Sequence, residues 1–436
     1  MKRRIGLMLG CLWGSFLGSQ ARAEDAPAML RIEDAVQLAL SRNERAKISD
    51  LNVRVAEVAV TRAVSPFLPS ATFSANDTQR PADVVRQGPN NIGTAAVTIT
   101  QPLLNVAAIP LFEQAKQLFE GQKAQTIDDK RLLAFDAAKA FFAALSADAV
   151  LEAAQRKLDT SKANLADTQA RAEAQLTSTN DVTRAQIDLG GSEREVELDR
   201  GAAQAAYIQL AFTINAPPPT GLAAPAAVLR ACREPVPRVD TLVHLALDHR
   251  PDLVAKKRLA LAAHDFAREP LLRLVPTLGL TGSFSGTTNT EAKPPAPAPL
   301  WNDEFIQATL TWPIYDAGVR YADKHSRDAS AGIADLTVDQ LARTVDAGVR
   351  SAAVTLESSQ TALNAAERAM NAARQSATET GILYRQGLAK AIELVDANDQ
   401  RFLAEVNYSS DEYSVALAYL ALRQALGLDP LGTELK

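Results

Sequence analysis

The chain contains the same unit twice, and this duplication constrains its fold more than any single motif does. Leu38-Ala39-Leu40 reappears as Leu245-Ala246-Leu247, a shift of 207 residues, and Leu151 reappears as Leu363, a shift of 212. A period of roughly 20–50 residues would indicate a solenoid, whereas this period has the length of a domain. We therefore expect a pseudo-symmetric fold in which both halves build the same structure.

Residues 1–23 have the pattern of an export signal. A basic start at 2–4 precedes the apolar run 5–17, and Ala21-Arg22-Ala23 is a cleavage signal. The apolar run is shorter than the ~20 residues that a membrane-spanning helix needs. It also continues past Gly10-Cys11, which argues against a lipoprotein cleavage site there. We expect an exported protein.

The composition of the exported chain limits its class. Removal of the signal takes away four positive charges and no negative one, so the net charge falls from −5 to −9. A nucleic-acid-binding protein would present a basic face, so this class is disfavoured. Cys232 is then the only cysteine, which excludes a disulfide framework. Aromatic residues make up only 5% of the chain, and its richness in Ala, Leu, Gln and Glu is typical of long helices.

Both units show the same predicted order: an amphipathic helical stretch that ends at prolines, two strands, and a long helical hairpin. The units lie at 24–216 and 239–436, with a linker at 217–238. The initial helical stretches cover about 30–65 and 239–274. The predicted strands are about 70–79 and 92–101 in the first unit, and about 277–286 and 304–312 in the second.

The predicted strands alternate between apolar and hydroxyl-bearing residues, as in Phe73-Ser74-Ala75. Segments of about ten residues with this alternation fit strands that cross a bilayer, although ordinary surface hairpins would show it too. Four strands cannot close a membrane barrel, and each unpaired backbone group at an open edge in lipid costs several kcal/mol. A sheet in a membrane would therefore need other copies of the chain. Two copies would give eight strands and three would give twelve.

Seven-residue repeats in the long segments predict coiled coils. Leu151, Leu158 and Leu165 keep this spacing within a helix that we expect over about 103–174. At 1.5 Å per residue, a helix of ~70 residues is about 100 Å long, several times the ~30 Å core of a bilayer. The repeats break at 175–181 and at 386–390, which we interpret as the turns of two helical hairpins.

Four stretches of the chain match a known family in their order and spacing. They are Leu30-Arg31-Ile32-Glu33-Asp34-Ala35, Gln101-Pro102-Leu103-Leu104, Trp312-Pro313-Ile314-Tyr315-Asp316-Ala317-Gly318, and the run from Tyr384 to Ala397. On these stretches the whole exported chain resembles the TolC-like outer membrane efflux proteins of Gram-negative bacteria. The resemblance implies a mainly α fold with a small β-barrel part. In a homotrimer, a twelve-stranded barrel in outer membrane lipid would continue as a coiled-coil helical barrel across the periplasm.

The resemblance also implies a function. The chain would be the exit duct of a tripartite efflux or type I secretion system, with a periplasmic adaptor and an inner-membrane transporter as partners. Glu393 and Asp396 match the acidic ring at the periplasmic entrance of the family, and they share one helix face. The alternative is that both are solvated surface acids. The candidate latch residues at the tip are Asp181, Tyr384 and Lys390. The candidate adaptor-docking residues are Leu176, Thr177, Gly387 and Leu388.

The sequence contains no recognisable pattern for catalysis or cofactor binding. The four histidines lack the spacing of metal ligands, and neither a phosphate-binding loop nor a dinucleotide fingerprint is present. We therefore expect no enzyme, no cofactor and no metal site. Two rival interpretations are a periplasmic coiled-coil adaptor and a structural protein without a pore. An adaptor would have a single hairpin between lipoyl-like halves, and neither rival needs duplicated strand pairs.

Overall fold

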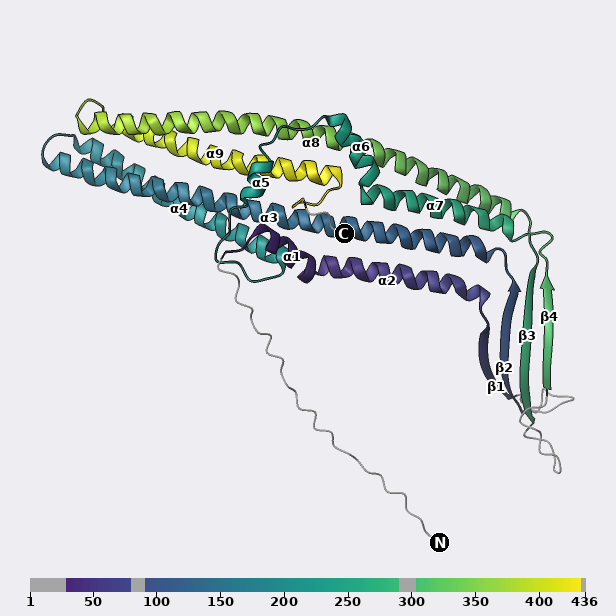
Figure 1. Ribbon diagram of the computed structural model, residues 1–436. Helices are drawn as coiled ribbons and strands as arrows, with labels where there is room; N and C mark the ends of the chain where they lie inside the picture. The colour runs from purple at the N-terminus through teal and green to yellow at the C-terminus, as the bar shows by residue number, and fades with distance from the viewer. Residues whose placement is uncertain (1–28, 80–90, 290–302, 433–436) are drawn as a thin grey trace, which may run out of the picture.

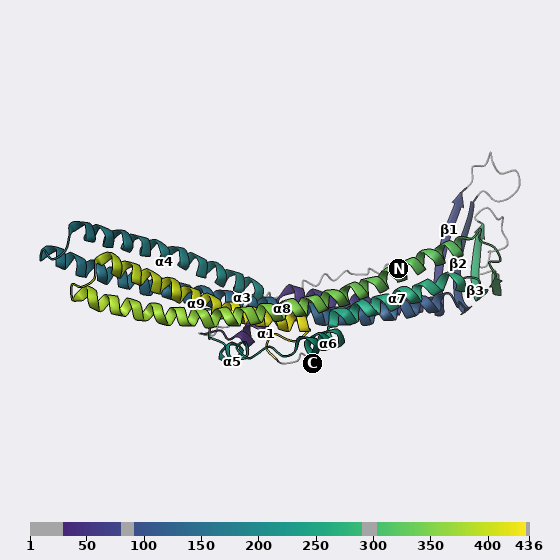
Figure 2. The same ribbon diagram turned by 90° about the horizontal axis from the view of Figure 1, so that it is seen from above.

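The computed structural model describes residues 29–79, 91–289 and 303–432. The predicted signal at 1–23 and most of the two loops that connect the predicted strands lie outside these residues. The molecule is long and narrow, with two helical hairpins reaching one end and one sheet at the other (Figure 1). The view from above shows the hairpins and the sheet at opposite ends of a helical body (Figure 2).

Both halves contain the same elements in the same order. The first half contains α1 (Ile32–Arg42), α2 (Glu44–Val64), β1 (Ser70–Gln79), β2 (Asn91–Leu104), α3 (Ala108–Glu173) and α4 (Thr179–Ile214). The second contains α6 (Val239–His249), α7 (Pro251–Leu272), β3 (Thr277–Asn289), β4 (Asp303–Thr311), α8 (Val319–Arg385) and α9 (Ala391–Leu426). The mainly helical fold with four strands and two long hairpins is the predicted class.

Each predicted initial helix is divided into two. Asn43 lies between α1 and α2 in extended conformation, and its side chain accepts a hydrogen bond from the Arg45 amide, which caps α2. Arg250 takes the same place between α6 and α7. It precedes Pro251, and the proline ring disfavours the helical conformation in the residue before it. Both units therefore bend at the same position, for different local reasons.

The linker contains more structure than its sequence predicts. The helix α5 (Ala226–Ala231) lies within it. Leu30 forms a parallel bridge with Leu222, in which the Leu30 amide donates to the Gly221 carbonyl at 2.9 Å. These contacts attach the linker to the start of the first unit.

The four strands form one antiparallel sheet in the order β1-β2-β3-β4. The register pairs Phe73 with Val97 and Val97 with Phe284, so these apolar side chains share one face across three strands. Ile306 of β4 lies opposite Gly282 on the same face, and its side chain is 80% exposed. The predicted alternation therefore places an apolar, solvent-exposed surface on one side of the whole sheet.

The helices lie side by side in a single curved row. Near the sheet the order is α2, α3, α7, α8, and towards the hairpin turns it is α4, α3, α9, α8. The interior is thickest where α1, α4 and α9 meet α3, at the fully buried Phe135, Phe141 and Phe142. Within the described residues, none of the helices is long and apolar enough to cross a membrane.

The coiled-coil seam of the second unit follows the predicted repeat, but that of the first unit does not. Leu356, Leu363, Met370 and Ala377 are all buried in α8. In α3, Leu151, Leu158 and Leu165 are only half-buried. The fully buried positions towards the turn of this first hairpin are polar, and they include Ser161, Asn164 and Thr168.

Hydrogen bonds explain why the hydroxyls of Ser161 and Thr168 can be buried in this seam. The Ser161 hydroxyl donates to Asp188 at 2.7 Å and lies 3.0 Å from the Ser192 hydroxyl. The Thr168 hydroxyl donates to the Asn164 carbonyl one turn earlier, at 2.8 Å. A buried hydroxyl is tolerated when it is hydrogen-bonded, so leucine is not required at these positions.

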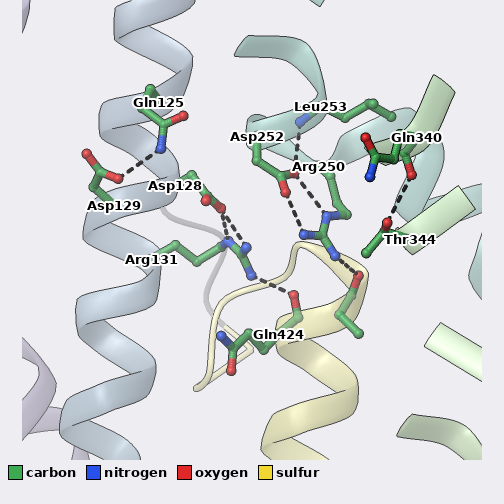
Figure 3. Close-up of polar contacts among 11 residues, drawn as sticks. Gln125, Asp128, Asp129, Arg131, Arg250, Asp252, Leu253, Gln340, Thr344 and Gln424 are labelled. Atoms are coloured by element: carbon green, nitrogen blue, oxygen red, sulfur yellow. Dashed lines mark hydrogen bonds and ion pairs between the residues drawn. The ribbon is translucent and has the colours of Figure 1, made fainter. Parts of the chain in front are cut away.

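Two arginines hold the last turn of α9 (Figure 3). Arg131 of α3 donates to the Gln424 carbonyl at 2.9 Å and forms an ion pair with Asp128 at 2.6 Å. Arg250 reaches the same turn and forms an ion pair with Asp252, also at 2.6 Å. The last carbonyls of a helix have no partner within it, so these guanidinium groups satisfy them.

Candidate functional site

The two hairpin turns lie at the same end of the molecule (Figure 1), and their backbones have the same geometry. In the first, Gln175 is left-handed and the Leu176 amide donates to the Arg171 carbonyl at 2.8 Å. In the second, Gly387 is left-handed and the Leu388 amide makes the equivalent bond. These are Schellman ends, which favour glycine, so Gln175 carries a backbone strain that Gly387 avoids.

An exposed leucine projects from each turn. The side chains of Leu176 and Leu388 are 77% and 73% exposed. The other two candidate docking residues differ in exposure: Thr177 is half-buried, and Gly387 is exposed. Each hairpin turn therefore presents an exposed leucine at an equivalent place.

Asp181 acts within its own turn. Its carboxylate accepts hydrogen bonds from the Thr177 hydroxyl at 2.7 Å and from the Ser178 hydroxyl at 2.9 Å. The Ser178 hydroxyl accepts in turn from the Asp181 amide, which completes a capping box at the start of α4. The hydrogen bonds from Thr177 and Ser178 lower the pKa of Asp181 below its usual value. Asp181 is therefore a helix cap within one chain.

Tyr384 is buried against α3. Its ring lies 4.6 Å from the Arg171 guanidinium, and its hydroxyl is 3.4 Å from that of Thr168. Arg171 also donates to the Tyr384 carbonyl at 3.2 Å. These contacts fasten the end of α8 to the end of α3. Within one chain, Tyr384 thus contacts Arg171 and Thr168, whereas Asp181 bonds to the residues of its own turn.

The predicted entrance acids are exposed at the start of α9. Glu393 accepts a hydrogen bond from the Lys390 amide at 3.3 Å, which caps this helix. Asp396 is exposed one turn further along, and Lys390 is exposed beside the turn. Glu393 and Asp396 therefore lie on an accessible helix face, with Lys390 near them.

A charged cluster that the sequence analysis did not identify joins the two hairpins further from the turns. The Lys157 amine lies 3.0 Å from Glu195 of α4 and 3.1 Å from Asp399 of α9. Burial alone lowers the pKa of Lys157, but the hydrogen bonds to these two carboxylates raise it above its usual value. Its partners are 38 and 242 residues away in the sequence, so no local motif could identify the cluster.

The described residues contain no group of three or more His, Cys, Asp or Glu side chains that could hold a metal ion. Cys232 is buried, and its thiol donates to the Leu229 carbonyl at 3.3 Å. Burial raises the pKa of this thiol, which makes it less reactive. The features that distinguish this chain are surfaces: two apolar turns, an acidic helix start and an apolar sheet face.

Comparisons with known proteins agree with this architecture. A family model described as outer membrane efflux protein matches residues 242–428. No curated protein matches the sequence. The fold is similar to the open state of the MtrE outer membrane channel of Neisseria gonorrhoeae, with a TM-score of 0.77, 20% identity, and coverage of 93% of this chain and 91% of that one.

Two further solved structures have the same fold. CusC gives a TM-score of 0.79 at 15% identity, with coverage of 91% of this chain and 92% of that one. The CmeC outer membrane channel of Campylobacter jejuni gives 0.76 at 15% identity, with coverage of 94% and 87%. At these identities the likeness establishes the fold, and it extends over both units.

Proposed function

Because this chain belongs to the TolC-like outer membrane efflux proteins, we propose that three copies of it form one exit duct that runs from the periplasm through the outer membrane. A periplasmic adaptor and an inner-membrane transporter would deliver the cargo to its helical end. The chain is a transport channel rather than an enzyme, and the energy for transport comes from the transporter.

The observation that carries this proposal is a sheet with one apolar face and two open edges. Among the described strands, β1 pairs only with β2, and β4 pairs only with β3. The apolar face suits lipid, where each unpaired backbone group at an edge costs several kcal/mol. Joining β4 of one copy to β1 of the next removes both edges, and three copies give twelve strands.

The helical row is open in the same way. On one side, α2 presents a stripe of exposed apolar residues at helical spacing, which are Ile48, Leu51, Val55 and Val58. On the other side, α8 carries the exposed Ile333 and Leu336. Two different open sides favour a head-to-tail arrangement, which closes into a ring when the rotation allows it. The ring would extend the barrel by the length of α3, about 100 Å.

The acidic helix start supports the proposed entrance. Three copies would bring Glu393 and Asp396 from each chain around one axis at the periplasmic end. A ring of carboxylates favours cations, as in cation-selective pores. We propose that this ring sets the ion preference of the closed or narrow duct.

The remaining tip residues fit two further roles. The exposed Leu176 and Leu388 suit an apolar contact with the adaptor, together with Thr177 and Gly387. For the latch, we propose that Lys390 of one copy pairs with the Asp181 carboxylate of another, while Tyr384 is held by Arg171 within its own chain. Conductance that does not rise when Asp181 and Lys390 are both replaced would contradict a latch role for this pair.

In the first experiment, the protein is extracted from isolated outer membranes with detergent, and its mass is measured by light scattering. Single-channel conductance of that species follows in planar bilayers. We expect a stable trimer with a cation-preferring conductance, and a weaker preference after Glu393→Gln with Asp396→Asn. The matched control is Glu379→Gln, an exposed acid of α8 outside the proposed ring.

Two outcomes would contradict the duct. One is a monomer in the soluble periplasmic fraction, which would favour a structural coiled-coil protein. The other is a membrane-bound protein that shows no conductance, either as the parent or as any of the tip variants. A periplasmic adaptor is already disfavoured because this chain has two helical hairpins and a duplicated strand pair.

A further inference from the structure

Within one chain, α3 and α9 form a seam between the two units. Two arginines of α3 make polar contacts along it: Arg131 donates to the Gln424 carbonyl at 2.9 Å, and Arg156 lies 3.5 Å from the Glu405 carboxylate. Glu405 is only 8% exposed. The seam thus has a charged contact at two levels, about seven turns of helix apart.

Large side chains fill the seam between these levels and just beyond Arg156. The rings of Phe142 and Tyr413 are 6.4 Å apart, and the Lys157 amine lies 4.6 Å from the centre of the Phe402 ring. Phe142 is fully buried, and the two aromatic residues of α9 are less than 10% exposed. The space between α3 and α9 is therefore set by bulky pairs.

The duplication supplies an equivalent for every residue of this seam. A shift of 212 residues places α3 on α8, which ends at Arg385 where α3 ends at Glu173, and it places α4 on α9. The buried positions Leu133 and Ala137 of α3 then coincide with the buried Val345 and Val349 of α8. The face of α3 that contacts α9 corresponds to a face of α8. The face of α9 that contacts α3 corresponds to a face of α4.

Both corresponding faces are exposed in the single chain. Five buried residues of the α9 face are Phe402, Glu405, Tyr413, Ala416 and Leu420. Their equivalents in α4 are all exposed, and they are Gly190, Glu193, Gly201, Gln204 and Ile208. The equivalents in α8 of Arg131, Phe142, Arg156 and Lys157 are also exposed, and they are Arg343, Val354, Arg368 and Ala369.

We infer that these two faces bind each other: α8 of one copy packs on α4 of the next copy in the arrangement that α3 has with α9. This inference rests on the proposed ring of copies and specifies the contacts that hold it together. Arg368 takes the place of Arg156, and Glu193 of the next copy takes the place of Glu405. The proposed interface therefore keeps an arginine opposite a glutamate at the level where the seam of one chain has Arg156 opposite Glu405.

The second arginine is retained as well. Arg343 takes the place of Arg131, and the carbonyl of Phe212 takes the place of the Gln424 carbonyl. Each of these carbonyls belongs to the last turn of its helix. The Phe212 carbonyl also accepts a long local hydrogen bond from the Asn215 amide at 3.3 Å, and the Gln424 carbonyl accepts one from the Gly427 amide at 3.2 Å. The guanidinium of Arg343 would satisfy the last turn of α4 in the next copy.

The side chains between these levels and just beyond Arg368 are smaller in the proposed interface than in the seam of one chain. Val354 with Gly201 replaces Phe142 with Tyr413, and Ala369 with Gly190 replaces the pair of Lys157 and Phe402. A Cβ added at either glycine would meet nothing within 4 Å in the single chain, so packing within that chain does not require glycine there. Small residues on both faces let α8 and α4 approach more closely between copies than α3 and α9 do within one.

A charge swap tests the ion pair. Arg368→Glu alone and Glu193→Arg alone would each place like charges together, which is strongly unfavourable at an interface. We expect each single variant to reduce the trimer in detergent at least about tenfold. The double variant should recover it, because the opposite charges are then restored in reverse order. Circular dichroism checks that each chain is helical.

The control is Asp159→Arg, which reverses an exposed charge on α3, a helix that has α4 and α9 on its two sides within the same chain. It should assemble as the parent does. Single variants that assemble fully, or a double variant that fails to recover, overturn the inferred pair. If the parent still forms a conducting trimer, either of these results overturns the ion pair and leaves the proposed duct intact. Failure of the inference and failure of the duct are therefore distinguishable.

A second variant tests the close approach. Gly201→Tyr restores the bulk of Tyr413 in α4 and has open space within one chain, so the fold should tolerate it. We expect Gly201→Tyr to lose the trimer while its helical content stays unchanged. The smaller substitution Gly201→Ala should retain more of the trimer. A trimer that tolerates Gly201→Tyr would overturn the small-residue contact.

Discussion

Asn43 donates a hydrogen bond to the carbonyl oxygen of Thr213 at 2.8 Å, across 170 residues of the chain. Its counterpart in the second unit, Arg250, donates to the Ala425 carbonyl at the same distance. Thr213 and Ala425 are equivalent under the duplication, since both lie one residue before the end of the second long helix of their unit. Each unit therefore ties the bend between its first two helices to the last turn of its hairpin.

We expect Asn43→Ala to lower the stability of the helical body. The substitution removes both the cap of α2 and the bond to Thr213, which together should contribute about 1–2 kcal/mol. Thermal unfolding followed by circular dichroism measures the effect. Asn43→Asp separates the two contributions, because aspartate can still accept from the Arg45 amide but cannot donate to Thr213. Equal melting temperatures for the parent and the alanine variant would contradict the role of this tie.

The ion pair at the second bend should make stability depend on pH. Burial alone raises the pKa of Asp252, but the hydrogen bonds from Arg250 and from the Leu253 amide bring it below its usual value. Such a group stabilises the fold above its unfolded pKa, about 3.9, and this contribution is lost as the pH falls through the lower folded pKa. Asp252→Asn should therefore be less stable than the parent at pH 7, and the difference should shrink below about pH 4. Thermal unfolding at several pH values checks this, and a difference that stays constant down to pH 3 would contradict it.

Two neighbouring positions in β4 distinguish the faces of the sheet. Ile306 lies on the apolar face, and Gln307 lies on the opposite one. Lysine on a lipid-facing position near the middle of a bilayer costs about 2–4 kcal/mol, whereas a lumen-facing position tolerates it. We expect Ile306→Lys to reduce the protein in outer membranes, and Gln307→Lys to insert normally with a weaker cation preference. Immunoblots of membrane fractions and conductance give the two readouts. The reverse pattern would mean that the hydroxyl-rich face meets the lipid.

The repeated order of elements and the four strands could be predicted because they depend on local periodicity and on the duplication. The alternation around Phe73 acts over a short stretch, and the duplication shows when the chain is compared with itself, so the sequence alone reveals both. The polar seam at Ser161 and Thr168 could not be predicted. It is stabilised by bonds to a helix that starts after the turn, and leucines at 151, 158 and 165 give a more obvious seven-residue repeat.

The candidate site divides in the same way. Breaks in the seven-residue repeats located the turns, and the family resemblance suggested their roles. Leu176 and Leu388 are exposed at these turns. The partners of Tyr384 are 213 and 216 residues away on α3, so its contacts with Arg171 and Thr168 follow only from the fold. Neither bend was predicted from the sequence. Asparagine within an amphipathic stretch is a weak stop signal, and Pro251, a stronger one, lies inside the stretch predicted as one helix over 239–274.

The contact between Arg171 and Tyr384 leads to a prediction on channel opening. It joins the ends of α3 and α8, so separating the two hairpins at the entrance would break the ring contact at 4.6 Å and the carbonyl bond at 3.2 Å. Together these interactions are worth about 1–3 kcal/mol. Arg171→Gln should therefore raise the conductance or the open fraction in planar bilayers. Arg385→Gln, a change of an exposed arginine at the same helix end, should not. Equal conductance of Arg171→Gln and the parent would mean that the entrance opens without separating α3 from α8.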